Sequence, residues 1–213
     1  MTKLIVYGAQ ASGSIAVEAA LTLLDIPYDL IEGATWADAS ARDRVAGTNP
    51  MRQIPTLIFP SGEIMTESAA ILIDLADRHP KSKLAPTIDD PKRRQFLRWM
   101  LYVSSAIYSL HWIKPDVGRI GAPASARDAV VNAVHDRIAF CWQNMDAQLT
   151  PGAYLLGEDL TVLDLYVTVV SRFGPWRERF TEAAAKMTPV VQRVDKDLRL
   201  TEFWAKRFPL DED

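Results

Sequence analysis

The chain has 213 residues, of which 48% are hydrophobic and 24% are charged, and its formal net charge is −3 at pH 7. This length is enough to bury a substantial core in one or two domains, and the composition is ordinary for a soluble globular protein. The slightly acidic balance gives no electrostatic reason to expect nucleic acid or an anionic membrane as a partner. The only basic cluster, Lys92-Arg93-Arg94 with Arg98, is expected to be the solvated face of a helix.

Few residues of the chain could hold a metal ion or form a disulfide. The single cysteine, Cys141, excludes a disulfide framework and any CxxC redox or zinc motif. The three histidines, His79, His111 and His135, are too scattered in the sequence to indicate a metal site, so we expect none. The apolar run at residues 4–7 is too short for a signal peptide or a membrane span, which favours a cytoplasmic protein without a membrane partner.

The N-terminal part of the chain alternates between strand and helix patterns. The apolar, β-branched run at residues 4–7 predicts a buried central strand. A loop of small residues leads into a helix predicted over 15–24, and alternating polar and apolar residues at 28–31 predict a second strand. Strand, helix and strand at this spacing form a βαβ unit. Residues 33–48 are expected to form an irregular helix and a loop over a site.

The stretch at residues 49–75 carries the densest local constraints. Pro55 stands before a short apolar run at 56–59 that predicts a buried strand, and a proline fits such a strand only at its first residue or at an edge. Turn residues follow, and then a second short strand at 64–65 and a helix that begins near residue 69. Together with the βαβ unit, this stretch completes a β-α-β-α-β-β-α module of thioredoxin-like type.

The same stretch has the chemistry to bind a ligand. A helix N-terminus with the Ser68 hydroxyl suits a carboxylate, and the neighbouring Glu67 suits an ammonium group, so the pair matches an amino-acid zwitterion. Ile54 precedes a proline and is therefore extended; if the Ile54–Pro55 bond is cis, the Ile54 backbone could pair with a peptide laid alongside. The alternative is that Ser68 merely caps a helix and Pro55 merely starts a strand.

The C-terminal part of the chain is predicted to be helical. Prolines bracket a linker at 79–90, and two long helices are predicted beyond it, over 93–113 and 127–149. Thr161 and Asp164 have the spacing of a capping box, and we expect them to hold a buried helix and to do no chemistry. Cys141 is expected to be a buried apolar residue.

These patterns divide the chain into an α/β part and an all-α part. We expect a thioredoxin-like, ligand-binding domain at 1–78, the linker at 79–90, and an all-helical domain at 91–213.

Three segments of the chain resemble the glutathione-binding core of the glutathione S-transferase family: Asn49-Pro50, Gln53-Ile54-Pro55-Thr56-Leu57 and Glu67-Ser68-Ala69-Ala70-Ile71. In that family the proline is cis, the residue before it pairs with the cysteinyl backbone of glutathione, and the Glu/Gln-Ser pair holds the γ-glutamyl end. The resemblance extends over most of the chain. It implies the glutathione transferase fold, glutathione as co-substrate without a metal, and a homodimer. The implied glutathione-binding residues are Gln53, Ile54, Pro55, Glu67 and Ser68.

A glutathione transferase must stabilise the thiolate of its co-substrate. A helix N-terminus and a hydrogen-bond donor lower a thiol pKa, and the loop at 8–14 lies in the right place for both. In the serine-type classes of the family the donor is a serine, and the family pattern falls on Ala11 or Ser12, with Ser14 at the helix start. The resemblance therefore favours Ser12 and Ser14 as catalytic residues, Ser12 as donor and Ser14 as cap, with Tyr7 or backbone N–H groups as alternatives. Gly13 occupies the place of the beta-class cysteine, which argues against a mixed-disulfide mechanism.

The second substrate is expected against the first long helix of the C-terminal part. Met100, Ser104, Tyr108 and Trp112 form an i,i+4 stripe there, and His111 lies beside it. Such a stripe also fits core or a dimer interface. The family resemblance implies that Ser104, Tyr108, His111 and Trp112 bind the acceptor.

The resemblance implies transfer of glutathione to an electrophilic, largely apolar small molecule. A second reading keeps the thiolate but changes the outcome to isomerisation, reductive cleavage or peroxide reduction. A third reading is an interaction module of the same fold with no turnover. The fold alone does not choose among them.

Overall fold

The computed structural model describes residues 3–174 and 176–209. Four strands form one sheet in the order β2-β1-β3-β4. The strands are β1 (Leu4–Gly8), β2 (Tyr28–Glu32), β3 (Thr56–Ile58) and β4 (Ile64–Thr66). β1 runs parallel to β2 and antiparallel to β3, which in turn is antiparallel to β4. The apolar β1 therefore lies inside the sheet, as its sequence predicts.

Nine α-helices are found among the described residues. They are α1 (Ser14–Leu23), α2 (Ala39–Ala46), α3 (Ser68–Arg78), α4 (Arg93–Tyr102), α5 (Arg127–Gln148), α6 (Val162–Val170), α7 (Trp176–Ala183), α8 (Thr188–Asp195) and α9 (Thr201–Arg207). None of the helices in this part of the chain is both long and apolar enough to cross a bilayer.

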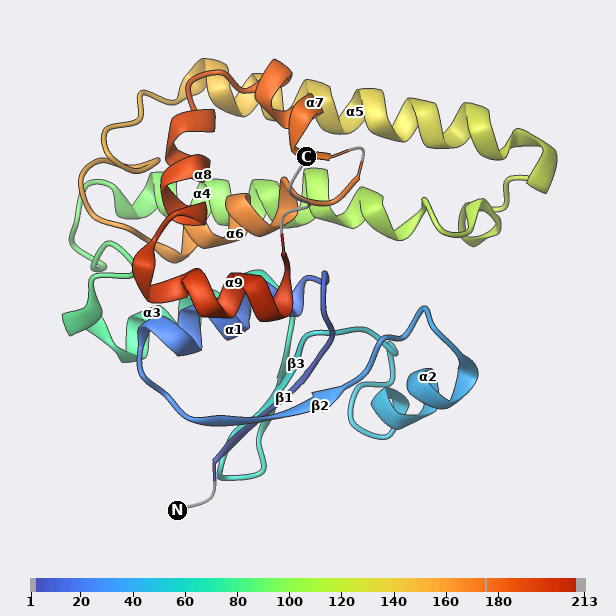
Figure 1. The fold of residues 1–213 in the computed structure, drawn as a ribbon, viewed down its shortest axis with the longest axis horizontal. Coiled ribbons are helices and arrows are strands. Elements are labelled where there is room, and N and C mark those ends of the chain that lie inside the picture. Colours follow the sequence, from blue (N-terminus) through green and yellow to red (C-terminus); the bar gives the residue numbers. More distant parts are fainter. Residues whose placement is uncertain (1–2, 175, 210–213) are drawn as a thin grey trace.

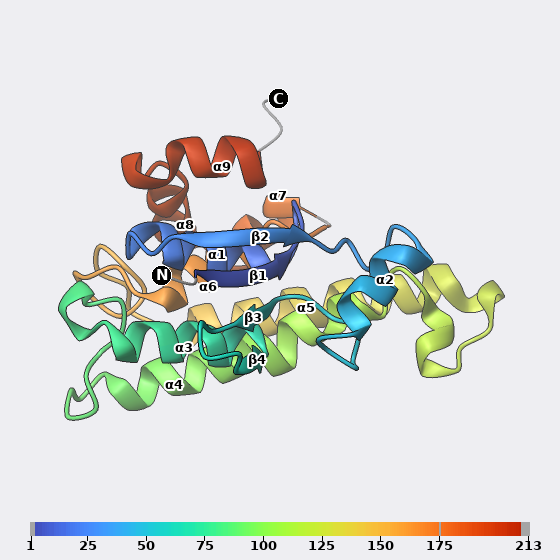
Figure 2. The same ribbon diagram turned by 90° about the horizontal axis from the view of Figure 1, so that it is seen from below.

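The N-terminal module has the predicted β-α-β-α-β-β-α order. α1 and α3 contact each other between the sheet and the C-terminal helices, whereas α2 lies at one end of the sheet, away from them (Figures 1 and 2). The fold class predicted from the sequence is confirmed: a thioredoxin-like domain followed by an all-helical region. The exact domain boundaries remain a prediction, although α3 ends at Arg78 and α4 begins at Arg93.

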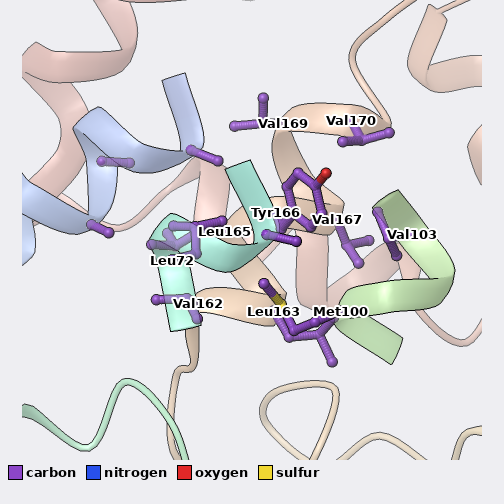
Figure 3. Close-up of a cluster of buried hydrophobic side chains, with 14 of the residues drawn as sticks. Leu72, Met100, Val103, Val162, Leu163, Leu165, Tyr166, Val167, Val169 and Val170 are labelled. Carbon is purple, nitrogen blue, oxygen red and sulfur yellow. The ribbon is translucent and has the colours of Figure 1, made fainter. Parts of the chain in front are cut away.

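α6 forms the centre of the molecule. It contacts α1 and α3 of the N-terminal module and α4 and α8 of the helical region. Figure 3 shows how its apolar side chains meet Leu72 of α3 and Met100 of α4. All residues of α6 are buried, so this helix joins the two regions through a shared core.

The predicted capping box at the start of α6 is confirmed. The Asp164 carboxylate accepts hydrogen bonds from the Thr161 backbone N–H at 2.8 Å and from the Thr161 hydroxyl at 2.7 Å. It also accepts the Leu155 N–H at 2.8 Å, so it ties the preceding connection to the helix. Because Asp164 is fully buried, burial raises the pKa of its carboxyl group to about 6 against these donors.

The prediction of one regular helix over residues 93–113 is wrong. α4 ends at Tyr102 and is followed by a π-helical turn, Val103–Ile107, and then by a 3₁₀ segment, Tyr108–Trp112. Within this region the hydroxyls of Ser105 and Ser109 donate to backbone carbonyls four residues earlier, at 2.7 and 2.5 Å. Such bonds compete with the regular ladder and bend helices. π-turns of this kind frequently lie at functional sites.

Candidate functional site

A pocket of about 820 Å³ lies between the N-terminal module and the segment after α4. Its lining brings together ten of the site residues predicted from the sequence. These are Ser12, Gln53, Ile54, Pro55, Glu67, Ser68, Ser104, Tyr108, His111 and Trp112. Ser14 and the alternative donor Tyr7 do not line it.

The wall formed by residues 49–56 is held by a buried asparagine. The Asn49 side-chain amide donates to the Gln53 carbonyl at 2.9 Å, and its oxygen accepts the Met51 N–H at 3.0 Å. The Ile54–Pro55 bond is cis. Among the described residues, no hydrogen bond is made to the Ile54 backbone N–H or carbonyl. The Ile54 backbone, at the pocket wall, is therefore available to pair with a peptide.

Glu67 and Ser68 lie at the N-terminus of α3. Glu67 is exposed and has a φ of 68°, a conformation that non-glycine residues rarely adopt. Ser68 is buried, and its hydroxyl donates to the hydroxyl of Tyr166 on α6 at 2.9 Å. The serine thus links the two regions of the molecule while its backbone begins the helix at the pocket wall.

The loop at residues 8–14 folds around two buried serine hydroxyls. The Ser12 hydroxyl donates to the Ala9 carbonyl at 2.7 Å and accepts the Ser14 N–H at 3.2 Å. The Ser14 hydroxyl lies 2.9 Å from that of Ser12 and donates to the Glu18 carboxylate at 2.7 Å. The prediction that Ser14 caps α1 is wrong, because its side chain points into this buried network; it is Ser12 that accepts a helix N–H.

The network around Ser14 reaches the last helix of the described chain. Glu18 is fully buried, and Arg207 of α9 donates to its carboxylate at 2.7 and 3.1 Å. Arg207 also donates to Glu32 at 2.5 Å, at the end of β2. The Ala11 N–H donates to the Arg207 carbonyl at 3.1 Å, while Ala11 itself has a φ of 51°. Through Arg207, α9 therefore stabilises the conformation of the loop at residues 8–14.

Tyr108 approaches the same loop from the pocket side. A Cβ atom placed on Gly13 would lie 1.8 Å from the Tyr108 hydroxyl oxygen, so any residue but glycine there would require Tyr108 to move. Burial raises the pKa of Tyr108 far above its usual value, so the hydroxyl is protonated and can donate at neutral pH. From the sequence, Tyr108 was predicted to bind the acceptor substrate, and its contact with the loop at residues 8–14 was not foreseen.

The far end of the pocket is aromatic and cationic. Tyr108 stacks on Phe173 with ring centroids 5.7 Å apart, and His111 meets Phe173 edge-on at 5.4 Å. Burial, together with the charges of Lys114 and His135, lowers the pKa of His111 to about 3, so its ring is neutral. Burial lowers the pKa of Lys114 to about 8.

Sequence reasoning missed four cationic residues of the pocket lining: Arg42, Arg52, Lys114 and Arg119. They come from separate loops and short helices, with no spacing in common. The only sequence signal for a cationic lining was that Lys114 follows closely after the residues predicted to bind the acceptor. A single lysine at such a position is usually a solvated surface residue.

Comparisons with known proteins agree with this geometry. A profile of the glutathione S-transferase N-terminal domain matches residues 14–78. The uncharacterized GST-like protein YncG of Escherichia coli (strain K12) is 32% identical over 199 residues, covering 92% of this chain and 95% of that protein. The chain belongs to the glutathione S-transferase family. Family membership accounts for the cis-proline, the Glu-Ser pair and the helical second region in one molecule.

Two other proteins are similar to this chain over most of its length. A glutathione transferase homologue from Sulfitobacter, solved with bound glutathione, is similar with a TM-score of 0.83 and 26% identity, covering 97% of this chain and 99% of that one. A probable maleylacetoacetate isomerase of Caenorhabditis elegans is 28% identical over 166 residues, covering 74% of this chain and 72% of that protein. In the described part of this chain, no cluster of three or more His, Cys, Asp or Glu residues has the arrangement of a metal site.

Proposed function

We propose that the protein transfers glutathione, as its thiolate, to an electrophilic small molecule. The observation that carries this proposal is the union of three features in one pocket: the cis bond before Pro55, Glu67 with Ser68 at a helix start, and buried hydroxyl groups opposite them. Each feature suits a different part of glutathione. The work of the protein is to bind and orient glutathione and to lower the pKa of its thiol, so that the thiol proton passes to water.

In the proposed pose, glutathione lies as an extended peptide along residues 52–55. Its γ-glutamyl carboxylate meets the N-terminus of α3 at Ser68, its ammonium group meets Glu67, and its cysteinyl backbone pairs with Ile54. The glycyl carboxylate then points past Gln53 towards Arg52 and Arg42, which both line the pocket. Ion pairing of that carboxylate by arginine follows from ordinary charge-assisted hydrogen bonding.

For the thiolate we propose two hydroxyl donors, Ser12 and Tyr108. Ser12 accepts the Ser14 N–H, so its oxygen is fixed at the start of α1, and its proton can turn from the Ala9 carbonyl to a bound sulfur. Tyr108 approaches from the opposite wall at Gly13. Hydrogen bonds to the charged form and the positive end of α1 both lower the pKa of a bound thiol. We do not propose Ser14 as a catalytic residue, because its hydroxyl already donates a hydrogen bond to the Glu18 carboxylate.

The test is calorimetry with glutathione, followed by titration of thiolate absorbance in the complex. Glu67→Ala leaves the ligand's ammonium group unpaired, and Ser68→Ala removes a hydroxyl that we propose turns from Tyr166 to the ligand's carboxylate, so each should weaken glutathione binding by about 1–3 kcal/mol. Glu63→Ala, which removes a carboxylate on the same hairpin but outside the pocket, is the matched control. Unchanged affinity in both pocket variants would refute the proposed pose.

A second candidate reaction is glutathione-dependent isomerisation, which the similarity to the probable maleylacetoacetate isomerase favours. The thiolate would then add to the substrate and leave again. The two reactions are distinguished by the product: transfer leaves glutathione bonded to it, and isomerisation returns glutathione free. A protein that binds glutathione but turns over neither class of substrate would be a binding module.

We further propose that the protein is a cytoplasmic homodimer. Leu101 of α4 and Phe140 of α5 are large apolar side chains left exposed, at 61% and 53%, on helices that lie side by side (Figure 1). Pairing of two copies over such residues would remove them from water. The only cysteine, Cys141, is a free and buried thiol, which suits a reducing compartment. Sedimentation at micromolar concentration should show twice the 23.8 kDa of one chain.

A further inference from the structure

The pocket is much more positive than the protein that contains it. Its lining includes four cationic side chains but a single carboxylate, Glu67, whereas the whole chain has a net charge of −3. Clefts lined by one sign of charge concentrate ligands of the opposite sign. The lining therefore favours ligands with negatively charged groups, which either glutathione or the second substrate could carry.

Glutathione accounts for only part of this charge. In the proposed pose its ammonium group uses Glu67, and its glycyl carboxylate uses Arg52 and Arg42. Lys114 and Arg119 belong to the other end, since they follow the segment that carries Tyr108, His111 and Trp112. These two cations have no counterpart in the co-substrate.

Lys114 and Arg119 are held in place without a negative partner. The Lys114 ammonium donates to the Gly174 carbonyl, which leaves two of its N–H groups unused. Arg119 donates to the Trp112 carbonyl at 2.6 Å and lies over the Trp112 ring at 5.0 Å. Among the described residues, no carboxylate lies within 4.0 Å of either charge.

Further groups at this end point to an oxygen-bearing ligand. The buried Nε2 atom of His111, another lining residue, has no hydrogen-bond partner within the described chain. Burial is the only cause that lowers the pKa of Lys114, so removal from water is not offset by any fixed anion. Lys114 is partly buried, so without an anionic partner it is destabilised by the loss of water, and a bound anion would offset that cost; Arg119 is exposed.

We infer that the acceptor substrate is an electrophile that carries a carboxylate, with that carboxylate held by Lys114 and Arg119. Its flat, conjugated part packs against Trp112, Tyr108 and Phe173, and its electrophilic carbon faces the sulfur of glutathione. This inference rests on the proposed function and narrows the acceptor from a largely apolar molecule to an anionic one.

A pair of aryl chlorides that differ in one charge provides the test. With 4-chloro-3,5-dinitrobenzoate, the glutathione sulfur forms a bond to the ring carbon and chloride leaves with the bonding electron pair; the methyl ester reacts in the same way without the negative charge. Both products, the acid conjugate and the ester conjugate, are prepared chemically. Calorimetry then measures their binding to the full chain, so that the result does not depend on turnover.

The acid conjugate should bind about tenfold or more tightly than the ester conjugate, as expected for charge-assisted hydrogen bonds. Lys114→Gln and Arg119→Gln should each reduce that preference while leaving affinity for the ester conjugate within about twofold, which also shows that the variants are folded. Lys196→Gln makes the same charge change on an exposed residue outside the pocket and should keep the full preference.

Equal affinities of the two conjugates in the parent protein would overturn the inference. So would a preference for the acid that survives in both pocket variants. If glutathione itself and both conjugates fail to bind, the proposed function fails and the acceptor inference falls with it. If glutathione binds normally and only the acid preference is missing, the inference alone is wrong.

Discussion

At the scale of single residues, two serines separated by one glycine have different environments. Both are buried, but only Ser12 lines the pocket, and the Ser14 hydroxyl donates a hydrogen bond to the Glu18 carboxylate. The same residue type therefore serves a proposed chemical role at one position and a structural role at the other. The environment of each hydroxyl, which no local sequence pattern reports, decides between them.

Replacing each serine with alanine should separate the two roles. Ser12→Ala should raise the pKa of bound glutathione and reduce turnover by roughly 10- to 1000-fold with little change in affinity, because the lost donor stabilises only the thiolate. Ser14→Ala should mainly lower the free energy of unfolding, by about 1–3 kcal/mol, since it leaves the buried Ala9 N–H without its acceptor and removes one of the donors to Glu18. The measurement is the pH–rate profile of both variants with their urea denaturation curves.

Tyr108→Phe completes that comparison because it removes the other proposed donor at nearly constant volume. If neither Ser12→Ala nor Tyr108→Phe moves the pH–rate profile, backbone N–H groups at the start of α1 stabilise the thiolate. A shift seen only in Ser14→Ala would reverse the assignment of the serines.

His111 should make the folded protein sensitive to mild acid. Its pKa is about 3 when folded and 6.5 when exposed, so between those values the unfolded chain binds the additional proton. Stability is then lost as the pH falls below 6.5. Between about pH 7.5 and about pH 5 the imidazole should remove roughly 2 kcal/mol from the free energy of unfolding. Urea denaturation of the parent and of His111→Gln at both pH values measures the difference, since all other titrating groups are shared. Equal pH dependence in the two proteins would contradict the low pKa.

At the scale of helices and strands, α6 depends on one carboxylate. Asp164 satisfies the Thr161 and Leu155 N–H groups in a site that water does not reach. Asp164→Ala should therefore lower the free energy of unfolding by about 2–4 kcal/mol, more than an exposed cap is worth. Asp159→Ala removes an exposed carboxylate a few residues earlier and should have little effect. Thermal unfolding with both variants is sufficient, and similar melting temperatures would show that the box contributes little.

The elements that the sequence predicted well are those with strong local signals. The strand before residue 8, the helix after residue 14, the cis-proline hairpin and the capping box all depend on neighbours in the chain. The failure over residues 93–113 has a local cause that the spacing of apolar residues does not report. The π-turn after Tyr102 interrupts a sequence with regular helical periodicity. There the Ser105 hydroxyl bonds to the Leu101 carbonyl and so competes with the backbone hydrogen bonds of a regular α-helix.

Predictability of the site follows the same rule. The proposed glutathione-binding residues were predicted because they lie in one stretch, 53–68, with a family pattern, and the structure brings them into one pocket. The cationic lining was missed because Arg42, Arg52, Lys114 and Arg119 become neighbours only after folding. The approach of Tyr108 to Gly13 was also invisible, since it joins residues from opposite regions of the molecule.

At the scale of the whole molecule, a buried ion pair joins the ends of the described chain. Arg207→Met should leave Glu18 as an unpaired charge in the core and lower the free energy of unfolding by about 3–5 kcal/mol. Adding Glu18→Gln should restore much of this loss, because the stranded charge is then absent. Urea denaturation of the parent, the single variant and the double variant forms the test. A double variant no more stable than Arg207→Met would show that the pair acts through packing and not through charge.

The bond from the Ala11 N–H to the Arg207 carbonyl also sets an order of events during synthesis. The loop that is proposed to activate glutathione leaves the ribosome well before α9, the helix that shapes it. Until residue 207 has emerged, Glu18 has no arginine and Ala11 has no carbonyl to hold it in its left-handed conformation. A chain without α9 therefore lacks the contacts that shape the loop at residues 8–14, and we expect it to bind glutathione without activating the thiol.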